Sequence, residues 1–243
     1  MTKIKILIPT AKELNEKNEV AVEKIADKVK NVIDVLVAKS VEDIKKDFKI
    51  SLVRAEVEKM RFLQIKNETS KNYVALNLFD GLMYRNINRN NLSTEEESYF
   101  LKNVFITSAL YGIINSTQAI APHRLDFHSK VTIKNMSLKK YWQNDYDSFI
   151  KSDDLVISLL SSEFLEVFSK DVRDKFIKIV FAKNDNGNLK IHSTTSKKCR
   201  GKLVSILAKN NITTLEELKK VSVDNFKFRE ELSTEKELFF IGE

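Results

Sequence analysis

Two hydrophobic patterns alternate along the whole chain, and this alternation is the feature that most constrains its fold. Short runs rich in β-branched residues predict strands at 3–9, 104–112, 154–162, 175–183, 188–195 and 237–242. Capping boxes and apolar residues at helical spacing predict helices at 18–39, from Ser40 onward, and at 51–66, 70–87, 93–103, 197–210 and 214–221. We therefore expect one α/β domain over residues 1–243, with a mixed central β-sheet surrounded by helices.

Composition excludes several classes of protein. With 243 residues, 42% hydrophobic and 31% charged, the chain resembles a soluble globular protein with a sizeable core. Its apolar runs are too short for a membrane span, and its N-terminal run is too short for a signal peptide. We expect a cytoplasmic monomer without a membrane partner. The single cysteine, Cys199, excludes an internal disulfide, and the histidine spacing favours neither a metal site nor a cofactor.

The charge of the chain leaves two interpretations open. The net charge of +7 and the pI of about 9.2 favour polyanionic partners such as nucleic acid. Lysine greatly outnumbers arginine, however, and a lysine-rich surface can serve solubility alone.

The segment "SALYGIINSTQAIAPHRLDF" at 108–127 combines glycine and proline in a chain poor in both. We expect Gly112 to end a strand and Pro122 to keep residues 121–126 extended. An extended loop of this kind can hold Arg124 over a cleft, where its planar fork of donors suits phosphate or carboxylate. Asp126 would point to the same side, so the alternative is an ion pair between Arg124 and Asp126 that only fixes the loop.

The predicted helix at 197–210 separates its cations into two groups. Its exposed face carries three lysines, Lys198, Lys202 and Lys209, whereas Arg200 falls on the inward side. A buried guanidinium needs a partner or a ligand, so Arg200 is a candidate binding residue. Cys199 either packs as a small apolar residue or has a lowered pKa beside these cations.

Residues 197–221 form a predicted helical hairpin, with a possible capping box at Thr213 and Glu216. The outline fits a helix-hairpin-helix element. Its turn lacks the glycines that usually bring backbone amides against phosphate, and a plain helical hairpin fits as well.

An ordered series of motifs runs through nearly the whole chain. These are "PTAK" (9–12), "LFDGLMYRNI" (78–87), "SALYG" with "APHRLDF", "KKYW" (139–142), "VISLLSSEF" (156–164) and "KKCRG" (197–201). In this order and spacing they resemble the YaaA family of bacterial peroxide stress resistance proteins. The resemblance implies a cytosolic protein of unusual α/β fold that limits oxidative DNA damage and free iron during peroxide stress. It also implies DNA binding through a positively charged cleft and a helix-hairpin-helix element.

Departures from the family pattern indicate a divergent member. The usual Ser-Pro-Ala-Lys appears here as Pro9-Thr10-Ala11-Lys12, and the usual Arg-Pro is replaced by Asn115-Ser116. The usual Tyr and Glu around Arg124 become His123 and Asp126. Positions that still match the family are Lys12, Tyr84, Tyr111, Gly112, Arg124, Ser161, Arg200 and Gly201.

Two functions of different classes follow from these residues. The first is a peroxide-stress protein that binds duplex DNA, with phosphate contacts from Lys12, Arg124, Lys198, Arg200 and Lys202. The second is an enzyme that acts on a nucleotide, a nucleobase or a phosphorylated small molecule in a polar pocket formed by Lys12, Tyr84, Tyr111, Arg124, Ser161 and Arg200. No triad, carboxylate pair or cofactor fingerprint assigns catalytic residues or a reaction. We expect one cleft to be lined by Lys12, Tyr111, Arg124, Ser161 and Arg200.

Overall fold

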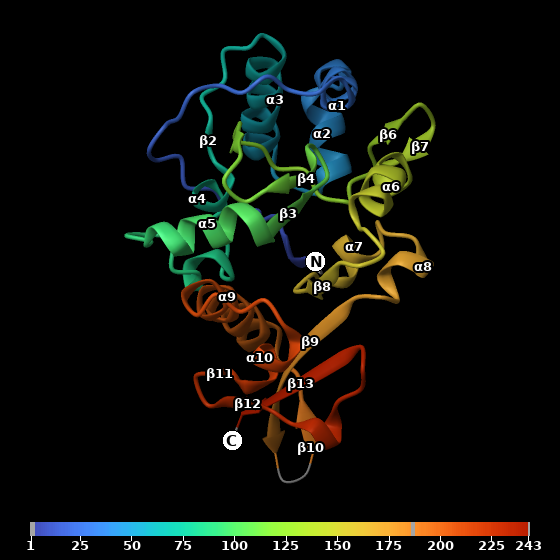
Figure 1. Ribbon diagram of the computed structural model, residues 1–243. Helices are drawn as coiled ribbons and strands as arrows, with labels where there is room; N and C mark the ends of the chain where they lie inside the picture. Colours follow the sequence, from blue (N-terminus) through green and yellow to red (C-terminus); the bar gives the residue numbers. More distant parts are fainter. Residues whose placement is uncertain (1–2, 186–187, 243) are drawn as a thin grey trace.

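A computed structural model describes residues 3–185 and 188–242 (Figure 1). In these ranges a nine-stranded mixed sheet has the strand order β11-β12-β13-β9-β8-β1-β3-β4, and β10 pairs with β9. Its strands are β1 (Ile4–Pro9), β3 (Val104–Ser108), β4 (Gly112–Asn115), β8 (Leu155–Ser158), β9 (Ile177–Asp185), β10 (Asn188–Lys190), β11 (Ser222–Val223), β12 (Phe226–Phe228) and β13 (Glu237–Gly242). The expected single α/β domain with a mixed central sheet is confirmed.

The centre of the sheet is parallel and its edges are antiparallel. β1 lies between β3 and β8, β8 pairs with β9, and β9 with β13, all in parallel. β4, β10, β11 and β12 add antiparallel pairs at the margins. Helices cover the central strands on both faces, so β1 reads as a nearly continuous apolar run instead of alternating with polar residues.

Alternate residues of β1 enter two separate hydrophobic cores. Ile6 and Ile8 pack on the face covered by α5 (Thr94–Asn103) and α9 (Ser193–Lys209). Leu7 packs on the opposite face with α1 (Asp27–Ala38), α3 (Leu52–Lys66) and α6 (Leu138–Phe149). The remaining helices are α2 (Val41–Phe48), α4 (Ala75–Leu78), α7 (Ser162–Leu165), α8 (Lys170–Arg173), α10 (Leu215–Lys220), and the 3-10 turns η1 (Tyr84–Asn86) and η2 (Glu230–Leu232). Among the described helices, none is both long and apolar enough to cross a membrane.

Several sequence-based boundaries are corrected. The helix expected at 18–39 begins only at Asp27, because Val20 bridges to Asn72 and holds the preceding segment extended. Residues 70–87 are mostly not helical. They form β2 (Tyr73–Val74), which pairs with β5 (Ala119–Ile120), then α4, a turn and η1. The hairpin β6 (Thr132–Ile133) and β7 (Met136–Ser137) was not predicted.

Two further predictions at strand ends are wrong. The strand at 188–195 ends at Lys190, and α9 begins at Ser193, four residues before the predicted start. The strand at 104–112 ends at Ser108, and Gly112 opens β4 instead of ending β3. Gly112 has a φ of 78°, and a Cβ there would lie 2.8 Å from the Trp142 ring. Both its conformation and its packing therefore need glycine.

Capping boxes locate three helix starts. Ser40 with Asp43 and Ser93 with Glu96 begin α2 and α5 where the sequence predicts. In the 197–221 hairpin, the N-cap is Thr214 with Glu217, one residue later than expected. The backbone amides of Thr213 and Thr214 donate to the Glu217 carboxylate at 3.0 and 3.1 Å.

Candidate functional site

A cavity of about 430 Å³ lies at the point where the order of the strands reverses. The chain passes from β1 to β3 on one side and later returns to β8 on the other side of β1. In open α/β sheets, ligands bind outside the carboxyl ends of strands at such a point. We call this space the central cavity. It is lined by residues that follow β1 and β8, by the turn at 81–84 and by α9, namely Pro9, Thr10, Ala11, Lys12, Glu13, Gly81, Leu82, Met83, Tyr84, Leu159, Ser161, Glu163, Phe164, Lys197 and Arg200.

Two glycines allow the walls of the central cavity to approach one another. A Cβ on Gly81 would lie 2.8 Å from the Cβ of Ala11. A Cβ on Gly201 would overlap the carbonyl oxygen of Met83 and lie 3.0 Å from the Cβ of Asn86. These close contacts hold α9 and the segment after β1 against the 81–86 turn, and they explain the glycines in "FDGLMY" and "KKCRG".

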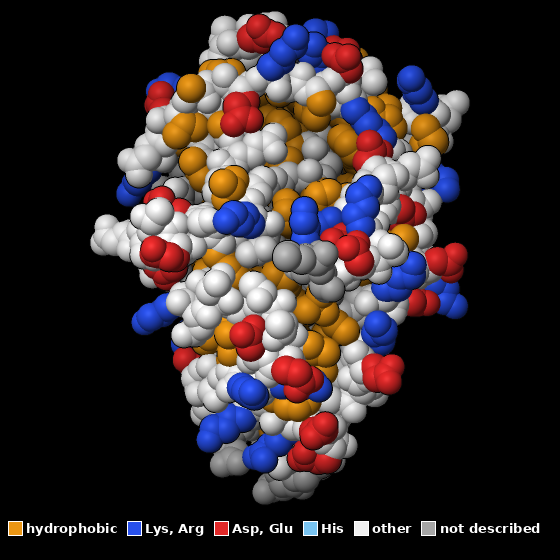
Figure 2. Space-filling model, viewed as in Figure 1, with side chains coloured by type: hydrophobic (Ala, Val, Ile, Leu, Met, Phe, Trp, Pro, Cys, Tyr) orange, Lys and Arg blue, Asp and Glu red, His pale blue; other side chains and the backbone are white. Residues whose placement is uncertain are grey.

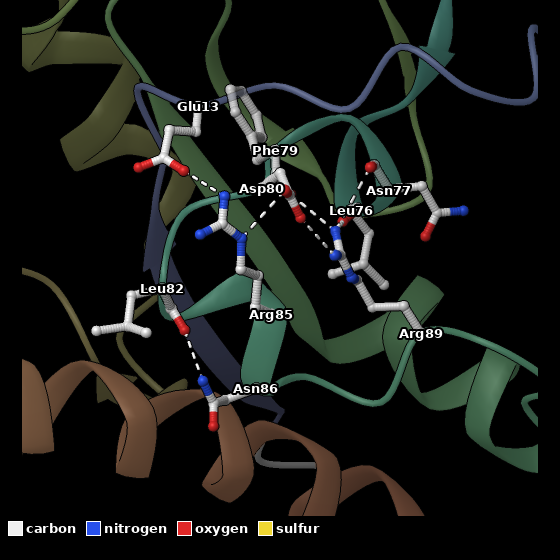
Figure 3. Close-up of polar contacts among 9 residues, drawn as sticks. All are labelled: Glu13, Leu76, Asn77, Phe79, Asp80, Leu82, Arg85, Asn86 and Arg89. Atoms are coloured by element: carbon white, nitrogen blue, oxygen red, sulfur yellow. Dashed lines mark hydrogen bonds and ion pairs between the residues drawn. The ribbon is translucent and has the colours of Figure 1, made fainter.

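A network around Asp80 fixes the turn that forms this wall (Figure 3). Arg89 pairs with Asp80 at 3.1 Å and donates to carbonyl oxygens of residues 76, 77 and 79 at 2.7 to 3.4 Å. Arg85 pairs with the same carboxylate at 3.1 Å and with Glu13. The network therefore ties the segment after β1 to the turn before η1.

Tyr84 closes the floor of the cavity from this turn. Its hydroxyl donates to the carbonyl oxygen of Pro9 at 2.8 Å, and the ring is fully buried. Burial raises the pKa of the phenol well above its ordinary value, so Tyr84 stays neutral and anchors the end of β1.

Arg200 brings an uncompensated cation to the cavity. Its Nε is buried without a hydrogen-bond partner, and its side chain forms no ion pair with any residue in the described ranges. Burial lowers the pKa of its guanidinium. Leaving a buried donor unsatisfied is unfavourable, so an anionic ligand would complete its surroundings.

Lys12, Lys197 and Ser161 add polar groups around the same cavity. The side chain of Lys12 is 61% exposed and pairs with Asp126 at 3.2 Å. Lys197 is exposed on α9, four residues after its start. Ser161 precedes α7, but its hydroxyl makes no capping hydrogen bond and is available to a ligand.

Arg124 opens onto a neighbouring groove of about 610 Å³ that shares Lys12 and Glu13 with the central cavity. The ion pair between Arg124 and Asp126, which was the alternative interpretation, does not form, because Asp126 pairs with Lys12. Instead, the backbone amide of Arg124 donates at 2.8 Å to the buried carboxylate of Glu58. This contact fixes the loop and leaves the guanidinium beside the groove.

Tyr111 and Gly112 lie apart from the central cavity. Tyr111 lines a separate cavity of about 520 Å³, and its hydroxyl accepts from the backbone amide of Ala121 at 3.1 Å. Burial raises the pKa of Tyr111 to about 12. His123 packs against its ring, with Nδ1 2.9 Å from the carbonyl oxygen of Ala121, and burial lowers its pKa to about 4. Of the five residues expected to share one cleft, the structure places Lys12, Ser161 and Arg200 in one cavity, Arg124 next to it and Tyr111 elsewhere.

The other candidates on α9 differ in their surroundings. Lys198 is exposed, whereas Lys202 forms an ion pair with Asp224 at 2.6 Å. Cys199 is buried, and burial raises the pKa of its thiol to about 11, which makes it a packing residue and not a reactive thiolate. Within residues 3–185 and 188–242, no group of three or more His, Cys, Asp or Glu side chains is placed to hold a metal ion.

Sequence reasoning missed Glu163 and Lys197. Glu163 follows Ser161 in "SSEF", just after β8, and its carboxylate lines the central cavity. A carboxylate five residues beyond the end of a parallel strand was the available signal. Lys197 precedes Lys198 in "KKCRG" and lines the central cavity, and its spacing of three residues from Arg200 on the same helix was the available signal.

Comparison with known proteins identifies the family. A family model described as peroxide stress protein YaaA matches residues 4–232. A UPF0246 protein of Streptococcus gordonii is 47% identical over 239 residues, which cover 98% of each chain. UPF0246 proteins of Streptococcus agalactiae and Streptococcus pneumoniae are 46% and 41% identical and cover at least 98% of both chains. Because the motifs, the fold and near full-length identity agree, this chain belongs to the peroxide stress protein YaaA family.

Proposed function

We propose that this chain serves the peroxide stress response as an enzyme or binding protein that takes a nucleotide or a phosphorylated small molecule into the central cavity. The observation that carries this proposal is the buried Nε of Arg200, which has no partner among the described side chains and backbone groups. The guanidinium as a whole is half-buried, and a phosphate group beside it would balance the charge that no described residue pairs.

The remaining lining of the central cavity fits the same ligand class. Lys12 and Lys197 add positive charge, and Thr10 and Ser161 add hydroxyl groups. A volume of about 430 Å³ falls in the range of roughly 300 to 1,000 Å³ usual for small-molecule sites. The apolar side chains of Met83 and Phe164 offer a surface for a nucleobase or another flat group.

Binding of adenosine monophosphate and inorganic phosphate, measured by isothermal titration calorimetry, tests the proposal. Arg200→Met should weaken binding at least about tenfold, because a hydrogen bond to a charged group contributes roughly 1.5 to 3 kcal/mol. Arg173→Met on α8, outside the cavity, is the matched control and should bind as the wild type does. Equal affinity of the Arg200 and Arg173 variants, or no binding of either probe, would contradict the proposal.

Duplex DNA is a second candidate ligand, and the charge of α9 favours it. Lys197 and Lys198 are exposed, and neither forms an ion pair with a described residue, in a chain of net charge +7. On the face shown in Figure 2, basic and acidic side chains are interspersed, so these lysines would act as a local contact. In the 197–221 hairpin, Glu217 already occupies the amides of Thr213 and Thr214. DNA phosphates would therefore contact the lysines of α9 and not the hairpin turn. Protection of DNA from iron-dependent damage would follow from such binding.

The salt dependence of DNA binding tests this second candidate. Affinity for a duplex should fall steeply between low and physiological salt and depend little on base sequence. Lys198→Glu should weaken binding of all duplexes alike. Lys46→Glu replaces another exposed lysine, on α2, and serves as the control because α2 packs on the opposite face of the sheet. Affinity that is insensitive to salt, or equal losses in both variants, would exclude an α9 contact.

A further inference from the structure

Two carboxylates meet at the edge of the central cavity. Glu163 lines the central cavity and also a small adjoining cavity of about 40 Å³, which Asp126 and Lys12 line as well. The side chains of Glu163 and Asp126 are only 14% and 18% exposed. Two mostly buried carboxylates that line one small cavity disfavour simultaneous ionisation, and the surroundings decide which of them takes up a proton more readily.

The two carboxylates differ in the cations that neighbour them. Asp126 has the ammonium group of Lys12 at 3.2 Å. Among the described residues, Glu163 forms an ion pair only with the imidazole of His128, at 3.4 Å, and His128 is 66% exposed and charged only when protonated. The charge of Lys12 also lowers the pKa of Glu163, but less than that of His128 does. The other oxygen of Glu163 accepts from the backbone amide of Phe127 at 2.9 Å. Burial, and secondly the charge of Asp126, raise the pKa of Glu163. His128, the Phe127 amide and Lys12 oppose this increase, and the net effect favours the protonated form of Glu163 relative to an exposed glutamate.

Other charged groups near this pair do not change the assignment. His123 lines the small cavity, but burial lowers its pKa to about 4 and keeps it neutral. Arg124 lines the same cavity and carries a constant positive charge. An anion bound at Arg200 would add negative charge to the central cavity and favour the protonated form of Glu163 further.

We infer that Glu163 is the proton donor of the central cavity, and that its carboxyl group gives a proton to an oxygen or nitrogen atom of the bound ligand. In this step the O–H bond of the carboxyl group breaks and the proton forms a bond to the ligand atom. Glu163 is left as a carboxylate, which regains a proton from solvent. The inference rests on the proposed function, since it needs an anionic ligand beside Arg200, and it assigns the chain to enzymes that use general acid catalysis.

Sulfate binding between about pH 5.5 and pH 8 tests whether ligand binding is coupled to a proton on Glu163. Sulfate is the probe because it does not titrate in this range. Wild-type affinity should rise as pH falls, toward the limit of about tenfold per pH unit that uptake of one proton allows. Calorimetry in two buffers with different ionisation enthalpies should show directly that sulfate binding takes up a proton.

Matched variants identify the residue that takes up the proton. Glu163→Gln keeps an acceptor for the Phe127 amide and should bind sulfate with little dependence on pH. His128→Asn should retain the wild-type dependence. A wild-type slope in Glu163→Gln, a flat profile in His128→Asn, or wild-type binding independent of pH would each overturn the inference and leave the anion site intact. Undiminished sulfate binding by Arg200→Met would instead overturn the proposed function itself.

Discussion

Alanine at position 201 should destabilise the protein although it lies inside a helix. Helix propensity alone predicts a gain of about 1 kcal/mol when a mid-helix glycine becomes alanine. The new Cβ would, however, overlap the carbonyl oxygen of Met83 and approach Asn86 to 3.0 Å. The turn cannot yield easily, because Asn86 donates to the carbonyl oxygen of Leu82 at 2.8 Å and the Asp80 network holds the same turn (Figure 3).

The new Cβ is attached to the backbone of α9 and would overlap a backbone oxygen of the turn, so no side-chain movement relieves the overlap and α9 itself must shift. Overpacking typically costs about 1 to 3 kcal/mol, and a rigid backbone neighbour places this case at the upper end. After subtraction of the propensity gain, we expect Gly201→Ala to lose about 2 kcal/mol of unfolding free energy. Displacement of α9 would also move Arg200 and weaken phosphate binding.

Urea unfolding followed by circular dichroism measures this loss, with a midpoint shift of roughly 1 M. Lys198→Ala, on the exposed side of the same helix, is the control and should change stability by less than about 0.5 kcal/mol. A Gly201→Ala protein as stable as the wild type, or more stable, would refute the close packing of α9 against the 83–86 turn.

Three further substitutions probe the site and its supports. Without ligand, Arg200→Met should leave the unfolding free energy unchanged or raise it by up to about 1 kcal/mol, because no partner is lost. A loss of about 3 kcal/mol or more in urea unfolding would instead show that Arg200 stabilises the fold. Tyr84→Phe removes the buried hydrogen bond to Pro9 and should cost about 1 to 2 kcal/mol by the same measurement, whereas wild-type stability would argue against that bond. Burial raises the pKa of the Glu58 carboxyl group above 4.5 in the folded protein. The unfolded chain therefore loses the proton of Glu58 at lower pH than the folded protein does. Wild-type stability should therefore fall as pH rises from 4.5 through the raised pKa, and Glu58→Gln, compared in unfolding curves across that range, should lack this decline.

Local patterns predicted most of the elements, since hydrophobic periodicity and capping boxes depend on nearby residues. The strand at 3–9 and the helices begun by Ser40 and Ser93 lie where these signals place them. Residues 70–87 were misread because their conformation depends on distant partners. Arg89 binds three carbonyl oxygens of this segment, and Gly81 faces Ala11, so tertiary contacts replace the helical hydrogen bonds that propensity favours.

The candidate site was predictable to the extent that it follows topology. Lys12 and Ser161 come directly after strands that prove to be neighbours, and the inward side of α9 correctly marks Arg200. The ion-pair partners of Asp126 and Glu163 were not predictable, because they depend on distances between side chains around the loop at 121–131. Asp126 forms its ion pair with Lys12 instead of Arg124, and Glu163 forms no ion pair with a lysine or an arginine of the described ranges.

The spacing of the motifs follows from the geometry of one cavity. Gly81 admits Ala11 and Gly201 admits the backbone at Met83, so three segments far apart in sequence meet only because a glycine stands at each contact. Beside these contacts lies Arg200, a half-buried cation whose Nε is buried and has no partner in the described parts of the chain. Packing alone would favour an apolar side chain there, since a well-packed hydrophobic group avoids the cost of burying an unpaired charge. An arginine held in place by two tight glycine contacts is instead the arrangement expected of a preorganised anion site, because its desolvation cost is offset only when the ligand is bound.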